Sequence, residues 1–273
     1  MAPATPPDPP TTGTSAGAPP PTGAPEPPAE PGSRPDLTVV LPIYNEALVL
    51  ESSLDQLVAH LEGSRRTFEI VCVDDGSADD SRAILDRRAT VEPRLRVFAL
   101  ASNRGKGAAV RHGVLQAAGR AVLFMDADLS TPLEELERFC DSLDAGYDVV
   151  IGNRRAPGSE IEVRQPWLRQ TLGRCFTLVT QRLLAPGVQD FTCGFKAFNA
   201  EAAQAIFQRS TLDGWAFDAE LVVIADVLRL RLAQVPVRWR HEEDTKVRLA
   251  AAVLGSGRDL IRIAWLRVRG KYS

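Results

Sequence analysis

Two carboxylates separated by a single residue, Asp126 and Asp128, directly follow an apolar run. The run, Ala121 to Met125, has the length and composition of a buried strand. Because side chains alternate along an extended segment, we expect both carboxylates on the same side of the chain, beyond the end of the strand. Oxygen ligands of this kind suit Mg²⁺ or Mn²⁺, which also bind diphosphate oxygens. Asp126 and Asp128 are therefore candidate metal ligands, unless the segment is a solvated turn in which an aspartate caps a helix.

Strand and helix patterns alternate along the chain from Asp36 and predict the framework that positions these carboxylates. Strands are expected at 37–41, 68–73, 95–99, 121–125 and 147–151, and helices at 46–61, 79–88, 106–118, 165–184, 200–207 and 217–229. We expect a polar loop at 190–196 and a strand at 232–239, at a sheet edge because Pro236 lacks a backbone donor. This alternation predicts an α/β fold with a mostly parallel sheet and helices on both faces.

Three polar loops, 42–46, 74–77 and 126–128, each follow an expected strand. Ligands of such sheets bind beyond the carboxyl ends of the strands, so the loops converge on one expected site. Asn45 and Glu46 also suit a helix start, as a cap and as a charge that complements the helix dipole. Asp75-Gly76 is likewise a common turn signal, and Pro132 suits the start of the helix after Asp128.

Composition limits the class of protein. Residues 1–35 hold 13 of the 20 prolines and no Leu, Ile, Val, Phe, Trp, Tyr or Cys, so we expect a disordered tail without the features of a signal peptide. The net charge of −3 argues against a nucleic-acid partner. Four widely spaced cysteines predict reduced thiols in a cytoplasmic protein and no zinc site. No apolar run reaches the roughly 18 residues that a membrane-spanning helix needs.

The loop motifs resemble a known family. Pro42-x-Tyr44-Asn45-Glu46, Asp74-Asp75-Gly76-Ser77 and Asp126-x-Asp128 are similar to the signature series of family 2 glycosyltransferases with the GT-A fold. Three further segments, 190–196, 214–220 and 235–239, resemble the branch that acts on polyprenyl phosphates, in particular the dolichyl-phosphate β-glucosyltransferases. The resemblance extends over roughly residues 36–266. It implies a glycosyltransferase domain at 36–246, followed by a basic amphipathic helical segment at 247–273.

The resemblance also implies roles for single residues. The side chains expected to line the nucleotide of a sugar donor are Pro42, Tyr44, Glu46, Asp74, Asp75, Lys106 and Asp126. Lys106 opens a helix, where free amides also favour an anion, although a solvated role is the alternative. Ser130 stands where mannosyltransferase relatives often have Gln, which leaves the third metal ligand open. Arg154 and Lys246 match basic residues that contact the lipid phosphate or the diphosphate, and Arg169 and Arg174 compete for one further role of this kind.

Asp190, Asp218 and Glu220 are carboxylates that could serve as a general base. A phosphate monoester has its second pKa near ~6, so a phosphate acceptor is mostly a dianion at neutral pH and attacks without losing a proton. We therefore expect Asp190 and Asp218 to organise the sugar and the loops, with a base role as the alternative.

The implied activity is inverting transfer of glucose from UDP-glucose to polyprenyl (dolichyl-type) phosphate, with Mg²⁺ or Mn²⁺ on the diphosphate. GDP-mannose is the alternative donor. The alternatives from other classes are a catalytically weak nucleotide-sugar-binding protein, a nucleotidyltransferase and a glycosyltransferase with a soluble acceptor. The expected location is cytoplasmic, peripheral at the inner face of the membrane.

The C-terminal segment suggests how that membrane contact is made. One expected helical face carries Leu249, Val253, Leu260, Ile261, Ala264 and Val268, and the opposite face carries Arg258, Arg262 and Arg269. A basic amphipathic helix of this kind can lie on an anionic membrane. An ordinary helix packed on the sheet is the alternative, and Gly255-Ser256-Gly257 is expected to divide the segment into two helices.

Overall fold

A computed structural model describes residues 34–161, residues 177–240 apart from 179, 183 and 186, and residues 249–273. Nearly all of the expected tail at 1–35 lies outside the described residues, as do Lys246, Arg169, Arg174 and most of the helix expected at 165–184. In chain order the elements are β1 (Leu37–Ile43), α1 (Ala47–Glu62), β2 (Phe68–Asp74), α2 (Ser81–Val91), β3 (Leu95–Ala99), α3 (Lys106–Gln116), β4 (Ala121–Phe124), α4 (Glu135–Asp144), β5 (Val149–Asn153), β6 (Glu160–Ile161), β7 (Lys196–Asn199), α6 (Ala200–Arg209), α7 (Phe217–Val227), β8 (Leu232–Pro236), β9 (Arg238–Trp239) and α8 (Leu249–Val268).

Seven strands form one sheet in the order β3-β2-β1-β4-β7-β5-β8. The first four strands are mutually parallel, β7 runs antiparallel to β4 and β5, and β8 pairs parallel with β5. The mostly parallel α/β sheet predicted from the sequence is therefore confirmed. The expected edge position of Pro236 is also confirmed, because β8 is the last strand in the order.

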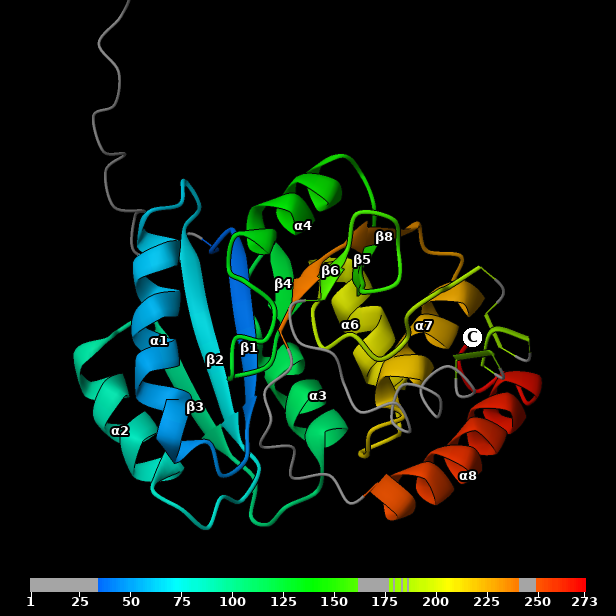
Figure 1. Cartoon of the computed structure of the whole chain (residues 1–273), viewed down its shortest axis with the longest axis horizontal. Coiled ribbons are helices and arrows are strands. Elements are labelled where there is room, and N and C mark those ends of the chain that lie inside the picture. The colour runs from blue at the N-terminus through cyan, green and yellow to red at the C-terminus, as the bar shows by residue number, and fades with distance from the viewer. Residues whose placement is uncertain (1–33, 162–176, 179, 183, 186, 241–248) are drawn as a thin grey trace, which may run out of the picture. The chain divides into compact units, whose positions relative to one another are not determined.

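Helices cover both faces of the sheet (Figure 1). Along β1, Leu37, Val39, Leu41 and Ile43 belong to a core cluster that includes buried side chains of α1, α2 and α4. Val40 belongs to the opposite cluster, which contains buried side chains of α3, α6, α7 and α8. Strand residues therefore alternate between two apolar cores, which explains why the central strands read as continuous apolar runs.

The sheet collects the polar segments at one edge. Ile43 and Asp74, the last residues of β1 and β2, are paired neighbours, so the loops that follow them emerge side by side. Because β7 is antiparallel to its neighbours, its first residue, Lys196, pairs with Phe124 near the end of β4 and with Ile151 in β5. The segment before β7 thus arrives at the same edge as the loops that leave β1, β2 and β4.

Several local expectations were wrong. Residue 196, expected in a loop, begins β7, because the stretch Lys196–Asn199 pairs with both β4 and β5 and lies between them in the sheet. Pro132, expected at the start of a helix, lies before it instead, because α4 begins at Glu135. The side chain of Asn45 does not cap α1; instead its Oδ1 atom accepts a hydrogen bond from Ala78 N (2.7 Å), which ties two loops together.

The C-terminal segment also differs from expectation, since α8 is one helix that continues through Gly255–Gly257. Among the described residues, no helix is both long enough and apolar enough to cross a bilayer. The expectation of reduced thiols holds for Cys72, Cys140 and Cys193, which are free and buried. Burial raises the pKa of the Cys72 and Cys140 thiols to about 12, so neither is a reactive nucleophile.

Candidate active site

The carboxylates after β4 lie in a turn. Leu129 has a φ of 54°, and the backbone turns back toward Asp126, so the expected extended conformation does not persist through Asp128. Asp126 forms an ion pair with Lys106, whereas Asp128 Oδ1 accepts hydrogen bonds from the amide (2.9 Å) and the hydroxyl (2.5 Å) of Ser130. Ser130 therefore orients Asp128.

The chemistry of these donors fits a divalent cation. Within the described part of the chain, the Oδ2 atoms of Asp126 and Asp128 accept no hydrogen bond. The side chain of Asp126 is 37% exposed, so it is accessible from solvent. Also within the described residues, no cluster of three or more His, Cys, Asp or Glu side chains could form a complete cage. Two carboxylates that leave positions for diphosphate oxygens and water match the way in which Mg²⁺ is usually held in phosphate-binding sites.

Lys106, the first residue of α3, supplies positive charge beside this acidic pair. Its Nζ atom contacts Asp126 and lies 5.6 Å from the ring centre of the half-exposed Trp215. Burial acts to lower the pKa of Lys106, but the charges of Asp126 and Asp218 outweigh it, so the net effect raises the pKa. The ammonium group therefore stays protonated at neutral pH.

Gly194 brings the segment before β7 against the ion pair. A β-carbon at this position would lie 2.9 Å from Lys106 Nζ and nearer still to the Asp126 carboxylate. No side chain larger than hydrogen fits there without displacing the pair. The glycine within Asp190-x-x-Cys193-Gly194-Phe195-Lys196 is thus a requirement of close approach to the site.

Lys196 and Asp218 form a buried ion pair that holds the loop containing Gly194. Lys196 is fully buried and also donates hydrogen bonds to the carbonyl oxygens of Phe191 (3.2 Å) and Cys193 (2.6 Å), so it fixes the shape of the loop. Burial raises the pKa of Asp218, against the opposing charges of Lys196 and Lys106. Lys196 was not predicted as a site residue, although its place in the 190–196 motif gave a signal.

Arg154 and Asp190 form a second pair of this kind. Two guanidinium nitrogens of Arg154, which follows β5, donate to the two carboxylate oxygens of the buried Asp190 at 2.7 and 2.9 Å. Burial acts to raise the pKa of Asp190, but the Arg154 charge holds it well below its usual range. The guanidinium carbon also lies 5.3 Å from the ring centre of Trp239. Asp190 therefore positions Arg154 at the edge of the sheet.

The loops expected to bind the nucleotide differ in accessibility. Tyr44 is 39% exposed, so its ring is available for stacking. Asp74 is mostly buried, and its Oδ1 atom accepts a hydrogen bond from Ser77 N (3.0 Å). Asp75 is also buried, and each of its oxygens accepts a backbone hydrogen bond of 2.8 Å, one from Arg104 and one from Gly105. Asp75 therefore shapes the loop that leads into α3.

Glu220 organises the loop between α6 and α7. It is fully buried and accepts hydrogen bonds from the amide and hydroxyl of Thr211, the amide of Leu212 and the hydroxyl of Tyr272, all between 2.8 and 2.9 Å. The same loop carries Trp215, which covers Lys106. All four hydrogen bonds that this carboxylate accepts therefore hold the structure together.

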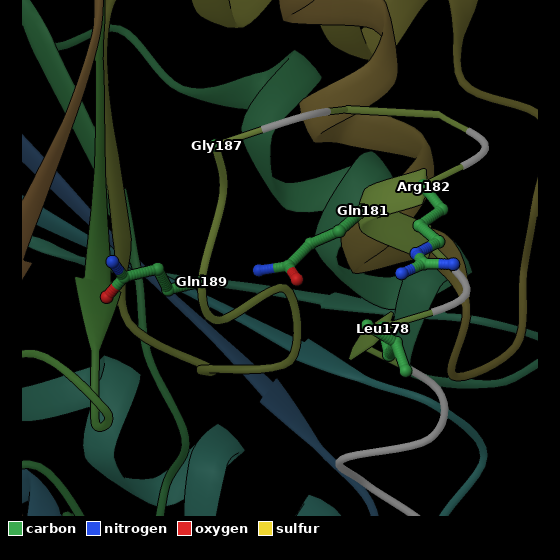
Figure 2. A pocket seen from close by; sticks show the side chains of 5 residues that line it. All are labelled: Leu178, Gln181, Arg182, Gly187 and Gln189. Atoms are coloured by element: carbon green, nitrogen blue, oxygen red, sulfur yellow. The ribbon is translucent and has the colours of Figure 1, made fainter.

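A separate hollow of about 460 Å³ is lined by residues of the segment that leads to Asp190 (Figure 2). Its described lining residues are Leu178, Gln181, Arg182, Gly187 and Gln189. Its inner wall is fixed to β8, because the side chain of Gln234 pairs with Gln189 N (2.8 Å) and with the carbonyl oxygen of Gly187 (2.9 Å). Among the predicted site residues that the structure describes, none lines this hollow.

Comparison with known proteins adds independent information. A family model described as glycosyl transferase family 2 matches residues 38–207. Dolichyl-phosphate beta-glucosyltransferase ALG5C of Trichomonas vaginalis is 37% identical over 238 residues, which cover 83% of this chain and 70% of that protein. The human dolichyl-phosphate beta-glucosyltransferase is 32% identical over 240 residues, covering 83% of this chain and 74% of its own length.

The fold is similar to that of solved structures. A glucosyl-3-phosphoglycerate synthase from Mycobacterium tuberculosis, in complex with Mn²⁺, UDP-glucose and phosphoglyceric acid, superposes with a TM-score of 0.63 at 20% identity. The match covers 84% of this chain and 80% of that one. At this level of identity the likeness shows the fold alone.

Proposed function

Because the chain belongs to glycosyltransferase family 2, we propose that it is an inverting glucosyltransferase that moves glucose from UDP-glucose to polyprenyl (dolichyl-type) phosphate. The products are polyprenyl phosphate β-glucose and UDP. The observation that carries this proposal is the meeting of an accessible acidic pair, Asp126 and Asp128, with Lys106 at the edge of the sheet where β1 and β2 end. The names of the 32–37% identical relatives support the choice of glucose and of the lipid acceptor.

The donor would lie across the ends of β1, β2 and β4. Tyr44 stacks on the base, and Asp74 accepts hydrogen bonds from the nucleoside, while Pro42, Glu46 and Asp75 shape this part of the site. A bound Mg²⁺ or Mn²⁺ would be held by Asp126 and Asp128 and would neutralise negative charge on the diphosphate. Lys106 adds a second positive charge at the same place, so its ammonium group stabilises the UDP that departs.

The acceptor requires positioning more than activation. A phosphate monoester is mostly dianionic at neutral pH, so its oxygen attacks the anomeric carbon without giving up a proton. No general base is therefore needed, which agrees with the engagement of Asp190 and Asp218 in ion pairs. In the described part of the chain, the second terminal nitrogen of Arg154 donates no hydrogen bond, so it can bind the acceptor phosphate. Lys246 stays a candidate for the same phosphate.

The test is a panel of radiolabelled nucleotide sugars incubated with polyprenyl phosphate and Mg²⁺. We expect label to enter the organic phase with UDP-glucose and not when the Asp128→Ala variant replaces the wild-type protein. Label from GDP-mannose instead would establish the alternative donor. Binding of UDP without any turnover would favour a nucleotide-sugar-binding protein, and label in a water-soluble product would indicate a soluble acceptor.

The proposed acceptor also implies where in the cell the protein acts. Polyprenyl chains reside in a bilayer, so the reaction takes place at a membrane surface. We place the protein peripherally, at the inner face of the membrane, where the nucleotide sugar of the cytoplasm meets the lipid phosphate.

A further inference from the structure

From Gly257 onward helix α8 has two different faces, and among the described residues only one of them packs against the domain. Leu260, Ile263 and Leu266 are buried in the core cluster that contains α7. Arg267 adds an ion pair with Asp226 of α7 (2.7 Å). Tyr272, just beyond the helix, is buried and bonded to Glu220. This buried face of α8 therefore anchors the helix to the domain.

The opposite face is apolar and exposed. Ile261 is 73% exposed, Trp265 50% and Val268 88%. At 3.6 residues per turn, positions 261, 265 and 268 form one continuous strip along the helix. This arrangement corrects the expectation from the sequence, because Leu260 and Ile261 do not share a face: the first is in the core and the second is in solvent.

Three arginines border this strip. Arg258, Arg262 and Arg269 are exposed. By helical geometry, these arginines and the apolar strip together span an arc of about 120° around the helix axis. The guanidinium of Arg269 lies 4.5 Å from the ring centre of Trp265, so the charged and apolar groups are in direct contact. Among the described residues, none of these three arginines forms an ion pair. Asp259 is the one acidic residue between Leu249 and Ser273.

We propose that this surface, formed by Ile261, Trp265, Val268, Arg258, Arg262 and Arg269, docks on an anionic lipid bilayer. A tryptophan beside arginines matches the interface of a membrane, where the ring lies at headgroup level and the cations meet lipid phosphates. Without such a partner, the surface would leave three large apolar side chains and three cations in water. The charge favours an anionic lipid surface over a second copy of the same basic face, which would be repelled.

The surface lies close to the candidate active site. A β-carbon at Gly214 would lie 4.0 Å from the Asp259 carboxylate, so α8 passes next to the loop that carries Trp215. Trp215 in turn covers Lys106. Docking through α8 would therefore bring this edge of the sheet toward the membrane. Membrane binding of this kind does not require the proposed transferase activity.

The experiment is sedimentation of the full chain with vesicles of phosphatidylcholine, either alone or mixed with phosphatidylserine, without donor or polyprenyl phosphate. We expect binding to the mixed vesicles and a blue shift of tryptophan emission that is absent in Trp265→Phe. Replacing Arg258, Arg262 and Arg269 together by Gln should weaken the partition about 100-fold, since each cation near the surface contributes about 1 kcal/mol. Replacing Ile261 and Val268 by Ser should weaken it at least about 10-fold.

Matched controls lie on other surfaces. Replacing the exposed Arg65, Arg120 and Arg229 by Gln, or the exposed Val91 by Ser, should leave vesicle binding unchanged. Equal thermal midpoints for all variants would establish that folding is intact. Equal binding to neutral and anionic vesicles, or retention of binding by the α8 variants, would overturn the proposal. Self-association that is lost in the α8 variants, without vesicle binding, would overturn it in favour of a dimer interface.

Discussion

The ammonium group of Lys106, on the first residue of α3, forms an ion pair with the carboxylate of Asp126, which follows β4. A cation of the protein thus occupies one oxygen of a candidate metal ligand. The Oδ2 atom of the same carboxylate accepts no hydrogen bond from the described residues and remains available to a metal ion. Under the proposed function, these two aspartates would share one lysine, one metal ion and the diphosphate of the donor.

The first prediction concerns Asp128. Its replacement by Ala removes one of two protein ligands, so we expect Mn²⁺ binding to be lost and glucosyl transfer to fall at least about 100-fold, equivalent to about 3 kcal/mol. Isothermal titration with Mn²⁺ in the presence of UDP measures the first effect. Asp141→Ala is the matched control, because that aspartate is exposed on α4 and lies outside the site. Unchanged activity of Asp128→Ala would remove the acidic pair from the mechanism.

The second prediction separates the lysine from the metal. Lys106→Met should retain or strengthen Mn²⁺ affinity, because the ammonium group no longer competes for Asp126. At the same time kcat should fall, because the departing UDP loses a positive charge. Titration calorimetry and steady-state kinetics on one preparation give both quantities. A parallel loss of Mn²⁺ affinity would indicate that Lys106 is needed to hold the acidic loop in place.

The sheet could be predicted from the sequence because its central strands are buried on both faces. For example, Phe68–Asp74 is apolar throughout except for two acids, and it was located to within one residue. Strand β7 could not be predicted, since Lys196 reads as a loop residue and only its neutralisation by Asp218 makes it a buried strand start. The acidic pair was found because Asp-x-Asp after a strand is a local pattern.

The interactions that hold the site residues in place could not be predicted from the sequence. Arg154 with Asp190, and Asp75 with Arg104, join segments that are about 30 residues apart or more along the chain. The two faces of α8 were also misassigned. The 3.6-residue period gives the relative angle between Leu260 and Ile261, but not which of them meets α7.

The third prediction concerns Gly194. Its replacement by Ala introduces a methyl group 2.9 Å from Lys106 Nζ, so the Lys106–Asp126 pair must separate. We expect activity to fall at least about 10-fold. Gly257→Ala is the matched control, because a β-carbon at that position contacts nothing within 4 Å. Glucosyl transfer by the two variants, compared at equal thermal stability, tests the steric argument. Equal activity of the two variants would contradict it.

The fourth prediction tests the nucleotide loop. Tyr44→Ala should weaken UDP binding by about 10-fold, because stacking of a base on an aromatic ring contributes about 1–3 kcal/mol. Tyr147→Ala is the matched control, since Tyr147 is 37% exposed and contacts Arg231 near the other end of the sheet. Calorimetric titration with UDP compares the two. Equal affinities would place the base elsewhere.

The last prediction uses pH to separate the buried Arg154–Asp190 pair from a surface ion pair. Asp190 has a pKa held far below the ordinary value of about 3.9, so its folded form binds the proton less readily than its unfolded form. Its stabilising effect is therefore fully present above that value and is lost as pH falls toward the folded pKa. Asp190→Asn leaves Arg154 unpaired and should cost about 3–5 kcal/mol of the free energy of unfolding at neutral pH. The difference from wild type should shrink progressively below pH ~4.

The matched control is Asp86→Asn, which breaks an exposed pair with Arg82 and should change the free energy of unfolding by less than about 1 kcal/mol. Urea unfolding across this pH range measures both variants, and a pH-independent deficit in Asp190→Asn would show that the loss comes from packing and not from charge.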